Sequence, residues 1–363
     1  MYSFEPTEEQ KMVIDAARKL AAKEYRPRMR EADEKGEPEA AWMDEGWELA
    51  LLPASIPEQF GGFGANSALT WVLAAEELAW GDLSGAMALL APNLVALPVL
   101  RAGTPEQKAM HLPAYCNDAW APGAAALMEP RIEFDPFALE TKAERTADGY
   151  RITGRKCNVP FALESDWVLV YAALEGATQG FLVPTNAPGV TVGERERNMG
   201  LRALPLYSLN LADCTVPAAN RLGGEQGCDF DLLLAASRTA LASLAVGVAR
   251  AAYEFTLDYT KQRTAFGEPL AQRQSIAFTL AELIIDIDAA RLLAWEAAWN
   301  LDNDRDAVRA AAFALNFASD MALRTADRAV QLLGGYGYVR DYPVELWLRN
   351  ARAFGVMEGI ATV

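Results

Sequence analysis

Apolar and polar positions recur with a helical period over the first third of the chain. Thr7 opens a capping box, and the run that follows carries Val13 and Leu20 on one face. A second capping box opens at Thr104, with a proline at the first helical position, where its missing N–H costs nothing. The pattern predicts an N-terminal all-helical domain over residues 1–122.

The period then changes to an alternation of apolar and polar residues. Asp148-Gly149 lies between two alternating segments, which is typical of a β-hairpin. Trp167–Tyr171 and Phe181–Val183 have the composition of strands, and prolines punctuate the whole region. We therefore expect a central antiparallel β-domain, a barrel or sandwich, over residues 123–222.

Longer helices return after this region. One apolar stripe has helical spacing and consists of Ile276, Leu280, Leu283, Ile284 and Ile287. Long helices with such stripes favour a C-terminal four-helix bundle over residues 223–363. The predicted fold class is therefore α+β and multidomain: a helical domain, an antiparallel β-domain and a helical bundle.

The segment Leu83–Leu100 is free of charged residues and is long enough to suggest a membrane span. Pro92 and Pro98 interrupt it, and either proline would break or kink a spanning helix. A buried pair of helices in a soluble core is the better interpretation. The N-terminus has neither a basic region nor an apolar run, so no secretory signal is expected.

Composition narrows the classes of function. The chain has 363 residues, a formal net charge of -16, one histidine and four cysteines. The acidic balance argues against nucleic acid and against an anionic membrane surface as partners. The cysteines are widely and irregularly spaced, so neither a metal site nor a disulfide framework is expected. A reduced, cytoplasmic setting is the simplest expectation.

Three segments near the C-terminal end of the chain contain recognisable sequence motifs. They are Arg263–Gly267 with Gln274, Gln331–Tyr338 with Tyr342-Pro343, and Arg349–Arg352 with Met357-Glu358-Gly359. In this order they resemble the RxxFG…Q, QxxGGxGY…YP and RDAK…YEG segments of the acyl-CoA dehydrogenase family. Weaker matches extend the resemblance over essentially the whole chain.

The resemblance implies FAD as cofactor. In this family a subunit contributes residues to the adenine diphosphate half of its neighbour's FAD, and the positions that match here are Arg263, Phe266, Gln274, Gln331, Gly334 and Gly335. An arginine offers the pyrophosphate a planar, permanently charged donor fork. The glycines allow the backbone to approach the cofactor closely. A homo- or hetero-oligomer, a dimer or tetramer, follows from the same resemblance.

The implied reaction forms a trans-2-enoyl-CoA from an acyl-CoA and passes electrons to an electron-transfer flavoprotein. It needs a base for the proton next to the thioester carbonyl, while flavin takes hydride from the next carbon. Glu358 matches the family's base. Some relatives place the base before the arginine that aligns with Arg238, but Ser237 stands there. Arg238 and Gly359 match positions near the substrate.

The chain departs from the family where the β-domain touches the flavin ring. Met128 replaces a threonine, and Asn158 and Pro160 replace the outer residues of a Trp-Ile-Thr segment. The family also continues through a further helix beyond the base. A flavin-poor or non-catalytic helper subunit of a hetero-oligomer is therefore the alternative prediction, and a different flavin reaction is a third. The acyl chain stays open.

Overall fold

The computed structural model describes residues 5–64, 67–265 and 267–363. Helices form the first part of the chain: α1 (Glu8–Leu20), α2 (Arg26–Lys35), α3 (Ala40–Trp47), α4 (Ala68–Gly81), α5 (Leu83–Leu89), α6 (Asn93–Ala102) and α7 (Pro105–His111). A π-helical turn, η1 (Ala21–Tyr25), joins α1 to α2, and the short 3₁₀ turns are η2 (Pro53–Ser55), η3 (Glu58–Phe60) and η4 (Leu112–Tyr115). Both predicted capping boxes are present, at Thr7 and Thr104.

The middle of the chain forms one sheet. Its strands are β1 (Ala124–Ala126), β2 (Lys142–Arg145), β3 (Gly149–Pro160), β4 (Trp167–Leu174), β5 (Ala177–Pro184), β6 (Val190–Arg195) and β7 (Leu206–Pro217). The strand order is β1-β4-β2-β3-β7-β6, with β5 paired to β4. The predicted hairpin joins β2 to β3, with Arg145 opposite Tyr150. The sheet is mixed rather than purely antiparallel, because β4 pairs in parallel with β1 and with β2.

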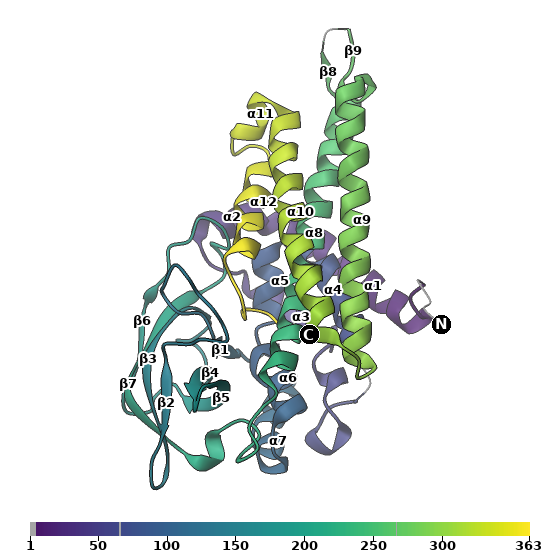
Figure 1. Cartoon of the computed structure of the whole chain (residues 1–363). Coiled ribbons are helices and arrows are strands. Elements are labelled where there is room, and N and C mark those ends of the chain that lie inside the picture. Colours follow the sequence, from purple (N-terminus) through teal and green to yellow (C-terminus); the bar gives the residue numbers. More distant parts are fainter. Residues whose placement is uncertain (1–4, 65–66, 266) are drawn as a thin grey trace.

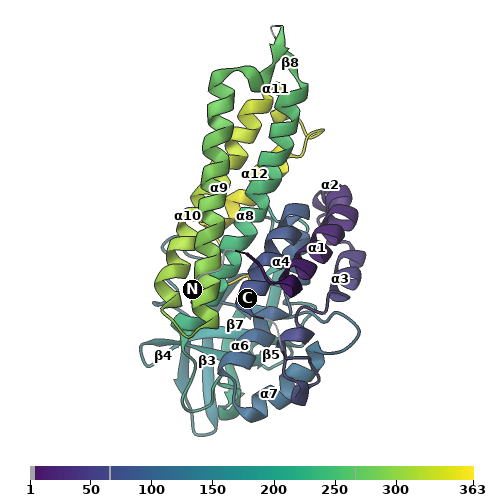
Figure 2. The same cartoon turned by 90° about the vertical axis from the view of Figure 1, so that its right-hand side faces the viewer.

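After the turn η5 (Ala218–Asn220), the last part is again helical. It comprises α8 (Phe230–Gln262), the strands β8 (Thr264–Ala265) and β9 (Glu268–Pro269), η6 (Leu270–Gln272), α9 (Gln274–Asp302), α10 (Ala307–Leu333), α11 (Gly335–Tyr338), α12 (Val344–Ala351) and η7 (Arg352–Gly355). α8 packs against α4, α9 and α10. The long helices extend away from the sheet, so β8, β9 and α11 lie at the end remote from it (Figures 1 and 2). The predicted α+β fold class is confirmed; the domain boundaries stay a prediction.

An ion network joins the two helical parts. Arg250 of α8 donates to Glu77 of α4 at 2.5 Å, and Arg291 of α9 donates to Glu76 at 3.0 Å. Burial alone would raise the pKa of Glu77, but hydrogen bonds from Arg250 and Arg18 outweigh it and hold that pKa below its usual value. The Glu77 carboxylate therefore stays charged between α4 and α8.

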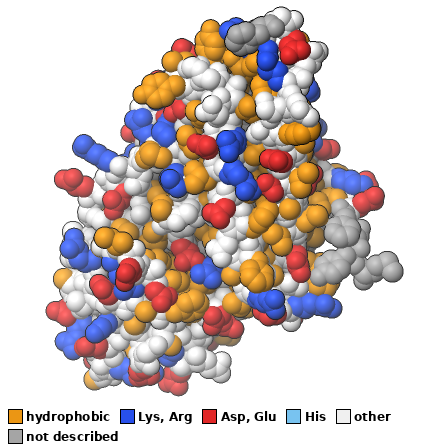
Figure 3. Space-filling view, turned by 45° about the horizontal axis from the view of Figure 1, so that its top comes forward, with side chains coloured by type: hydrophobic (Ala, Val, Ile, Leu, Met, Phe, Trp, Pro, Cys, Tyr) orange, Lys and Arg blue, Asp and Glu red, His pale blue; other side chains and the backbone are white. Residues whose placement is uncertain are grey.

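The charge-free segment is a buried helix pair, as expected. α5 and α6 bend by 47° at their junction and lie within the core. α8 is also long and apolar enough to cross a membrane, but 89% of its apolar window is buried inside the protein. Its apolar surface is thus already covered by neighbouring elements. Over the face in Figure 3, hydrophobic side chains are interspersed with both acidic and basic ones.

Candidate functional site

Glu358 follows α12 and η7 in a segment that other parts of the molecule hold in place. Arg349 of α12 binds Asp33 of α2 at 2.7 Å. Asn350 Oδ1 accepts a hydrogen bond from the N–H of Leu201, in the β-region, at 2.8 Å. The helix that delivers Glu358 is therefore attached both to the N-terminal helices and to the β-domain.

Gly359 turns the chain directly after Glu358. Its φ is +74°, a left-handed conformation that favours glycine. A Cβ at this position would lie 2.6 Å from Cδ2 of Leu127. Only glycine therefore fits both the left-handed turn and the close contact with Leu127.

The sequence placed Arg238 near the substrate, and the structure places it on Glu358. Arg238 Nε donates to Glu358 Oε1 at 2.5 Å, with the two side chains 21% and 17% exposed. The charge in the apolar part of α8 is thus paired with the candidate base. Both groups remain partly accessible from outside.

Met128 touches the same residue. Its sulfur accepts a hydrogen bond from the backbone N–H of Glu358 at 3.4 Å, although 230 residues separate the two in sequence. The methionine is 7% exposed. The sequence shows that methionine replaces the family's threonine at position 128. It does not reveal the contact with Glu358, because the two positions are far apart in the chain.

A buried ion pair fixes the segment that carries Met128. Lys156 Nζ donates to Glu129 Oε1 at 3.0 Å and to the carbonyl oxygen of Leu127 at 2.9 Å. Burial lowers the pKa of Lys156 to about 8, even though the charge of Glu129 raises it. Backbone N–H groups of Glu140 and Thr141 also donate to the Glu129 carboxylate, each at 2.7 Å. Sequence reasoning did not identify this pair.

The other departures lie on β3. Asn158 has a φ of +51°, and its Oδ1 accepts from Asn198 Nδ2 at 2.9 Å. Pro160 is buried and brings no polar side chain. Of positions 128, 158 and 160, only Asn158 has a polar side chain, and that side chain is engaged with Asn198.

The predicted adenine-side residues gather at the remote end of the helical bundle. Arg263 follows α8 and lies over the ring of Tyr336, with its guanidinium carbon 5.4 Å from the ring centre. Gly334 has a φ of +60°, and a Cβ on Gly334 or Gly335 would meet nothing within 4 Å. Gln274 begins α9 and Gln331 lies near the end of α10, both exposed.

This group is separated from Glu358 within one chain. β8, β9 and α11 lie at the tip of the bundle, away from the chain's own sheet (Figure 1). Phe266, which was assigned to the same group, lies outside the described residues. The predicted adenine-side residues are therefore accessible to a ligand or a second chain at the end of the bundle remote from the sheet.

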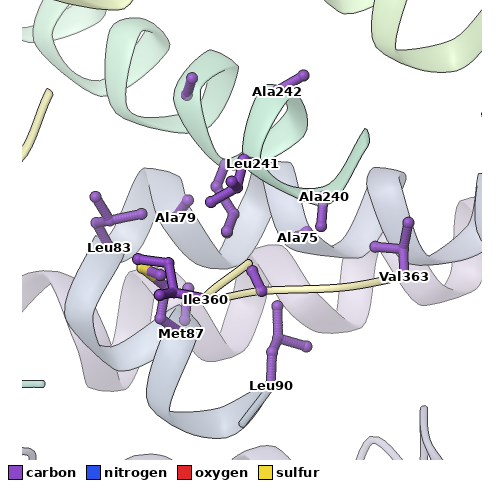
Figure 4. Close-up of a cluster of buried hydrophobic side chains, with 14 of the residues drawn as sticks. Ala75, Ala79, Leu83, Met87, Leu90, Ala240, Leu241, Ala242, Ile360 and Val363 are labelled. Carbon is purple, nitrogen blue, oxygen red and sulfur yellow. The ribbon is translucent and has the colours of Figure 1, made fainter. Parts of the chain in front are cut away.

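A small cavity is lined in part by Gly359, the residue after Glu358. Its volume is about 20 Å³, and its walls include Leu94, Leu127, Phe230, Ser237 and Gly359. The following residues, Ile360 and Val363, pack among side chains of α4, α5 and α8 (Figure 4). The segment after the candidate base thus fills space between the helices and leaves a cavity of this size.

No metal site is found in the described parts of the chain: they contain no group of three or more His, Cys, Asp or Glu residues able to hold an ion.

Comparison with known proteins agrees with this arrangement. Models of the acyl-CoA dehydrogenase N-terminal, middle and C-terminal domains match residues 7–119, 124–214 and 231–363. These matches span most of the chain and follow its helical, β and helical parts in order. The chain belongs to the acyl-CoA dehydrogenase family.

Individual relatives are similar over nearly their full lengths. The probable acyl-CoA dehydrogenase YngJ of Bacillus subtilis is 36% identical, with 99% of this chain and 97% of the relative covered. Butyryl-CoA dehydrogenase of Megasphaera elsdenii has a similar structure, with a TM-score of 0.90, 33% identity and coverage of 99% and 96%. A glutaryl-CoA dehydrogenase of Mycobacterium smegmatis, solved with FADH2, gives a TM-score of 0.87 at 25% identity and coverage of 98% and 92%.

Proposed function

We propose that this chain catalyses FAD-dependent α,β-dehydrogenation of an acyl-CoA, with Glu358 as the base. The observation that carries the proposal is the placement of Glu358: a carboxylate hydrogen-bonded to Arg238, on a segment held by both other parts of the molecule. Family membership supports an oxidoreductase acting on acyl-CoA. The product is the trans-2-enoyl-CoA, and electrons pass to an electron-transfer flavoprotein.

The residues at the remote end of the bundle fit the adenine half of FAD. Arg263 offers a donor fork, and the open space at Gly334 and Gly335 admits a close ligand. At the ring end the fit is poorer, because Met128 and Pro160 supply no polar side chain. When bound, FAD supplies the hydride acceptor for the reaction.

The chain's own residues would remove the substrate proton and polarise the thioester carbonyl. Glu358 removes the Cα proton, and Arg238 holds the carboxylate in position beforehand. The N–H of Glu358 donates to the thioester oxygen as negative charge develops there, which stabilises the enolate-like state. Met128 must first withdraw its sulfur from that N–H. A methionine can do so because its side chain is flexible.

The alternative is a helper subunit with little flavin of its own. The contact between Met128 and the N–H of Glu358 favours it, since the group that should polarise the substrate already has an acceptor. Such a subunit would lend Arg263, Gln274 and Gln331 to a flavin in a partner chain. Either form implies a homo- or hetero-oligomer, and the four unpaired cysteines are in keeping with a cytoplasmic setting.

The first test is the visible absorption spectrum of the purified chain. About one FAD per chain, bleached by butyryl-CoA, supports the enzyme. Glu358→Gln should keep the flavin but slow bleaching by roughly a hundredfold or more, since general-base catalysis contributes 10²–10⁴-fold. Glu296→Gln, on the exposed side of α9, is the matched control.

Each outcome selects one function. A flavin-free chain that restores activity when mixed with a flavin-binding relative would support the helper subunit. Unchanged bleaching in Glu358→Gln would exclude Glu358 as the base. A flavin-loaded chain that no acyl-CoA bleaches would contradict the dehydrogenase proposal.

A further inference from the structure

Three residues with hydroxyl side chains line the cavity beside Gly359: Tyr171, Ser237 and Thr362. Ser237 is 5% exposed, and its Oγ is buried without a hydrogen bond. Tyr171 is 6% exposed and packs its ring 5.3 Å from that of Phe230, yet its hydroxyl bonds to none of the described residues. Leaving a buried hydroxyl such as that of Ser237 unpaired costs about 1–3 kcal/mol. A ligand that supplies the missing partner would remove that cost.

Apart from these three hydroxyl-bearing residues, the described wall of the cavity is apolar. It includes Leu94, Pro98, Leu127, Leu233 and Leu234, and none of the described residues that line it is charged. A charged substituent would therefore lie unpaired in an apolar site, which is strongly unfavourable. The volume of about 20 Å³ is that of one water-sized group. Size and lining together select a single small, neutral, polar group.

The cavity is placed next to the proposed chemistry. Ser237 precedes Arg238, which binds Glu358, and Gly359 follows Glu358 and forms part of the wall. A group in the cavity therefore lies close to the carbons on which Glu358 acts. Ala361 and Thr362 also line the cavity, and its volume of about 20 Å³ leaves no room for a long alkyl chain.

We propose that the preferred acyl group is short and carries a neutral hydrogen-bonding group, such as a hydroxyl, beyond the reacting Cα–Cβ bond. Ser237 and Tyr171 recognise that group. The proposal rests on the proposed function, because it assigns the cavity to the acyl end of an acyl-CoA. A site built to hydrogen-bond a substrate hydroxyl rejects the analogue that lacks it, since its own polar groups are then left unpaired.

The test compares two thioesters that differ by one oxygen. Binding of crotonyl-CoA and of trans-4-hydroxycrotonyl-CoA to the purified protein is measured by calorimetry, which needs no turnover. We expect the hydroxylated ligand to bind roughly fivefold tighter or more. Ser237→Ala and Tyr171→Phe should each reduce this ratio toward one. Because each ratio is measured on a single protein, a general loss of stability does not affect it.

Ser243→Ala is the matched control. Ser243 lies on the same helix, but its hydroxyl donates to the carbonyl oxygen of Val72 at 2.5 Å, so the ratio should not change. Equal binding of the two ligands by the wild type, as expected if a water occupies the cavity, would overturn the proposal. So would a preference that survives in both Ser237→Ala and Tyr171→Phe.

The two proposals fail in different ways. Bleaching of bound flavin by butyryl-CoA, combined with equal binding of the two enoyl thioesters, would reject the polar acyl group and leave the dehydrogenase intact. A clear binding preference in a chain that no acyl-CoA bleaches would support the recognition of the hydroxyl and reject the dehydrogenation.

Discussion

At the scale of single residues, the contact between Met128 and Glu358 bears most directly on the proposed function. The sulfur of Met128 accepts a hydrogen bond from the backbone N–H of Glu358, the residue that carries the proposed base. Lys156 holds the backbone on either side of Met128 through Leu127 and Glu129. Rotation of the methionine side chain would free the donor without moving this backbone.

Met128→Thr should therefore raise kcat/KM for flavin reduction by roughly tenfold. One donor to a developing oxyanion is worth about 10²–10³ in rate, and the wild type already gains part of this whenever Met128 rotates away from the N–H. The shorter side chain removes the sulfur and offers a hydroxyl. Met110→Thr, at an exposed position on α7, is the control. A fall in rate with full flavin content would mean that Met128 assists the reaction.

At the scale of elements, α5 begins at a buried acid. Asp82 caps this helix by accepting from the N–H of Gly85 at 2.7 Å. Burial, reinforced by the charge of Asp33, raises the pKa of Asp82 to about 7, although the backbone hydrogen bonds lower it. The folded state thus favours the neutral acid, whereas the unfolded chain ionises near the usual value.

The sign of the pH dependence follows. A raised carboxyl pKa stabilises the fold at low pH, and this contribution is lost as pH rises from about 4 to about 7. Asparagine does not ionise, so Asp82→Asn should not lose this stability as pH rises. The difference in free energy of unfolding, variant minus wild type, should therefore be a few kcal/mol larger at pH 8 than at pH 5. Urea denaturation at both pH values measures it. Asp306→Asn, at the exposed cap of α10, should show no such change.

At the scale of the whole molecule, the two proposed halves of the flavin site lie at opposite ends of one chain. Exposed hydrophobic side chains recur every seven residues along α9, at Phe278, Ile285 and Leu292, which are 59%, 66% and 45% exposed. This spacing puts them on one face of the helix. Burial of such a face against a second subunit would bring adenine-side residues to another chain's sheet.

If this face forms the proposed subunit interface, replacing Phe278 and Ile285 together by Glu should dissociate the oligomer, since burying each of these side chains contributes about 1.5–3 kcal/mol. Flavin content should fall with it, because the adenine half loses its donors. Light scattering and the flavin-to-chain ratio measure the two effects. Met12→Glu, exposed on α1, is the control. Dissociation with flavin retained would show that one chain holds FAD alone.

The sequence by itself determined the local structure and the order of the parts. The caps at Thr7 and Thr104 and the turn at Asp148-Gly149 depend on atoms a few residues apart, so their residue types suffice to predict them. The ordered motifs likewise indicated the family, and with it Glu358 and Arg238 as candidate site residues, because a whole pattern carries more information than any single motif.

Only the tertiary structure decided how the site is closed. The contact between Met128 and the N–H of Glu358 joins positions 230 residues apart. The parallel pairing of β1 with β4 and the unpaired hydroxyl of Ser237 likewise depend on how distant segments pack. Hydrophobic periodicity specifies which face of an element is buried, but not which neighbour covers it. The neighbours therefore decide the size and polarity of the site.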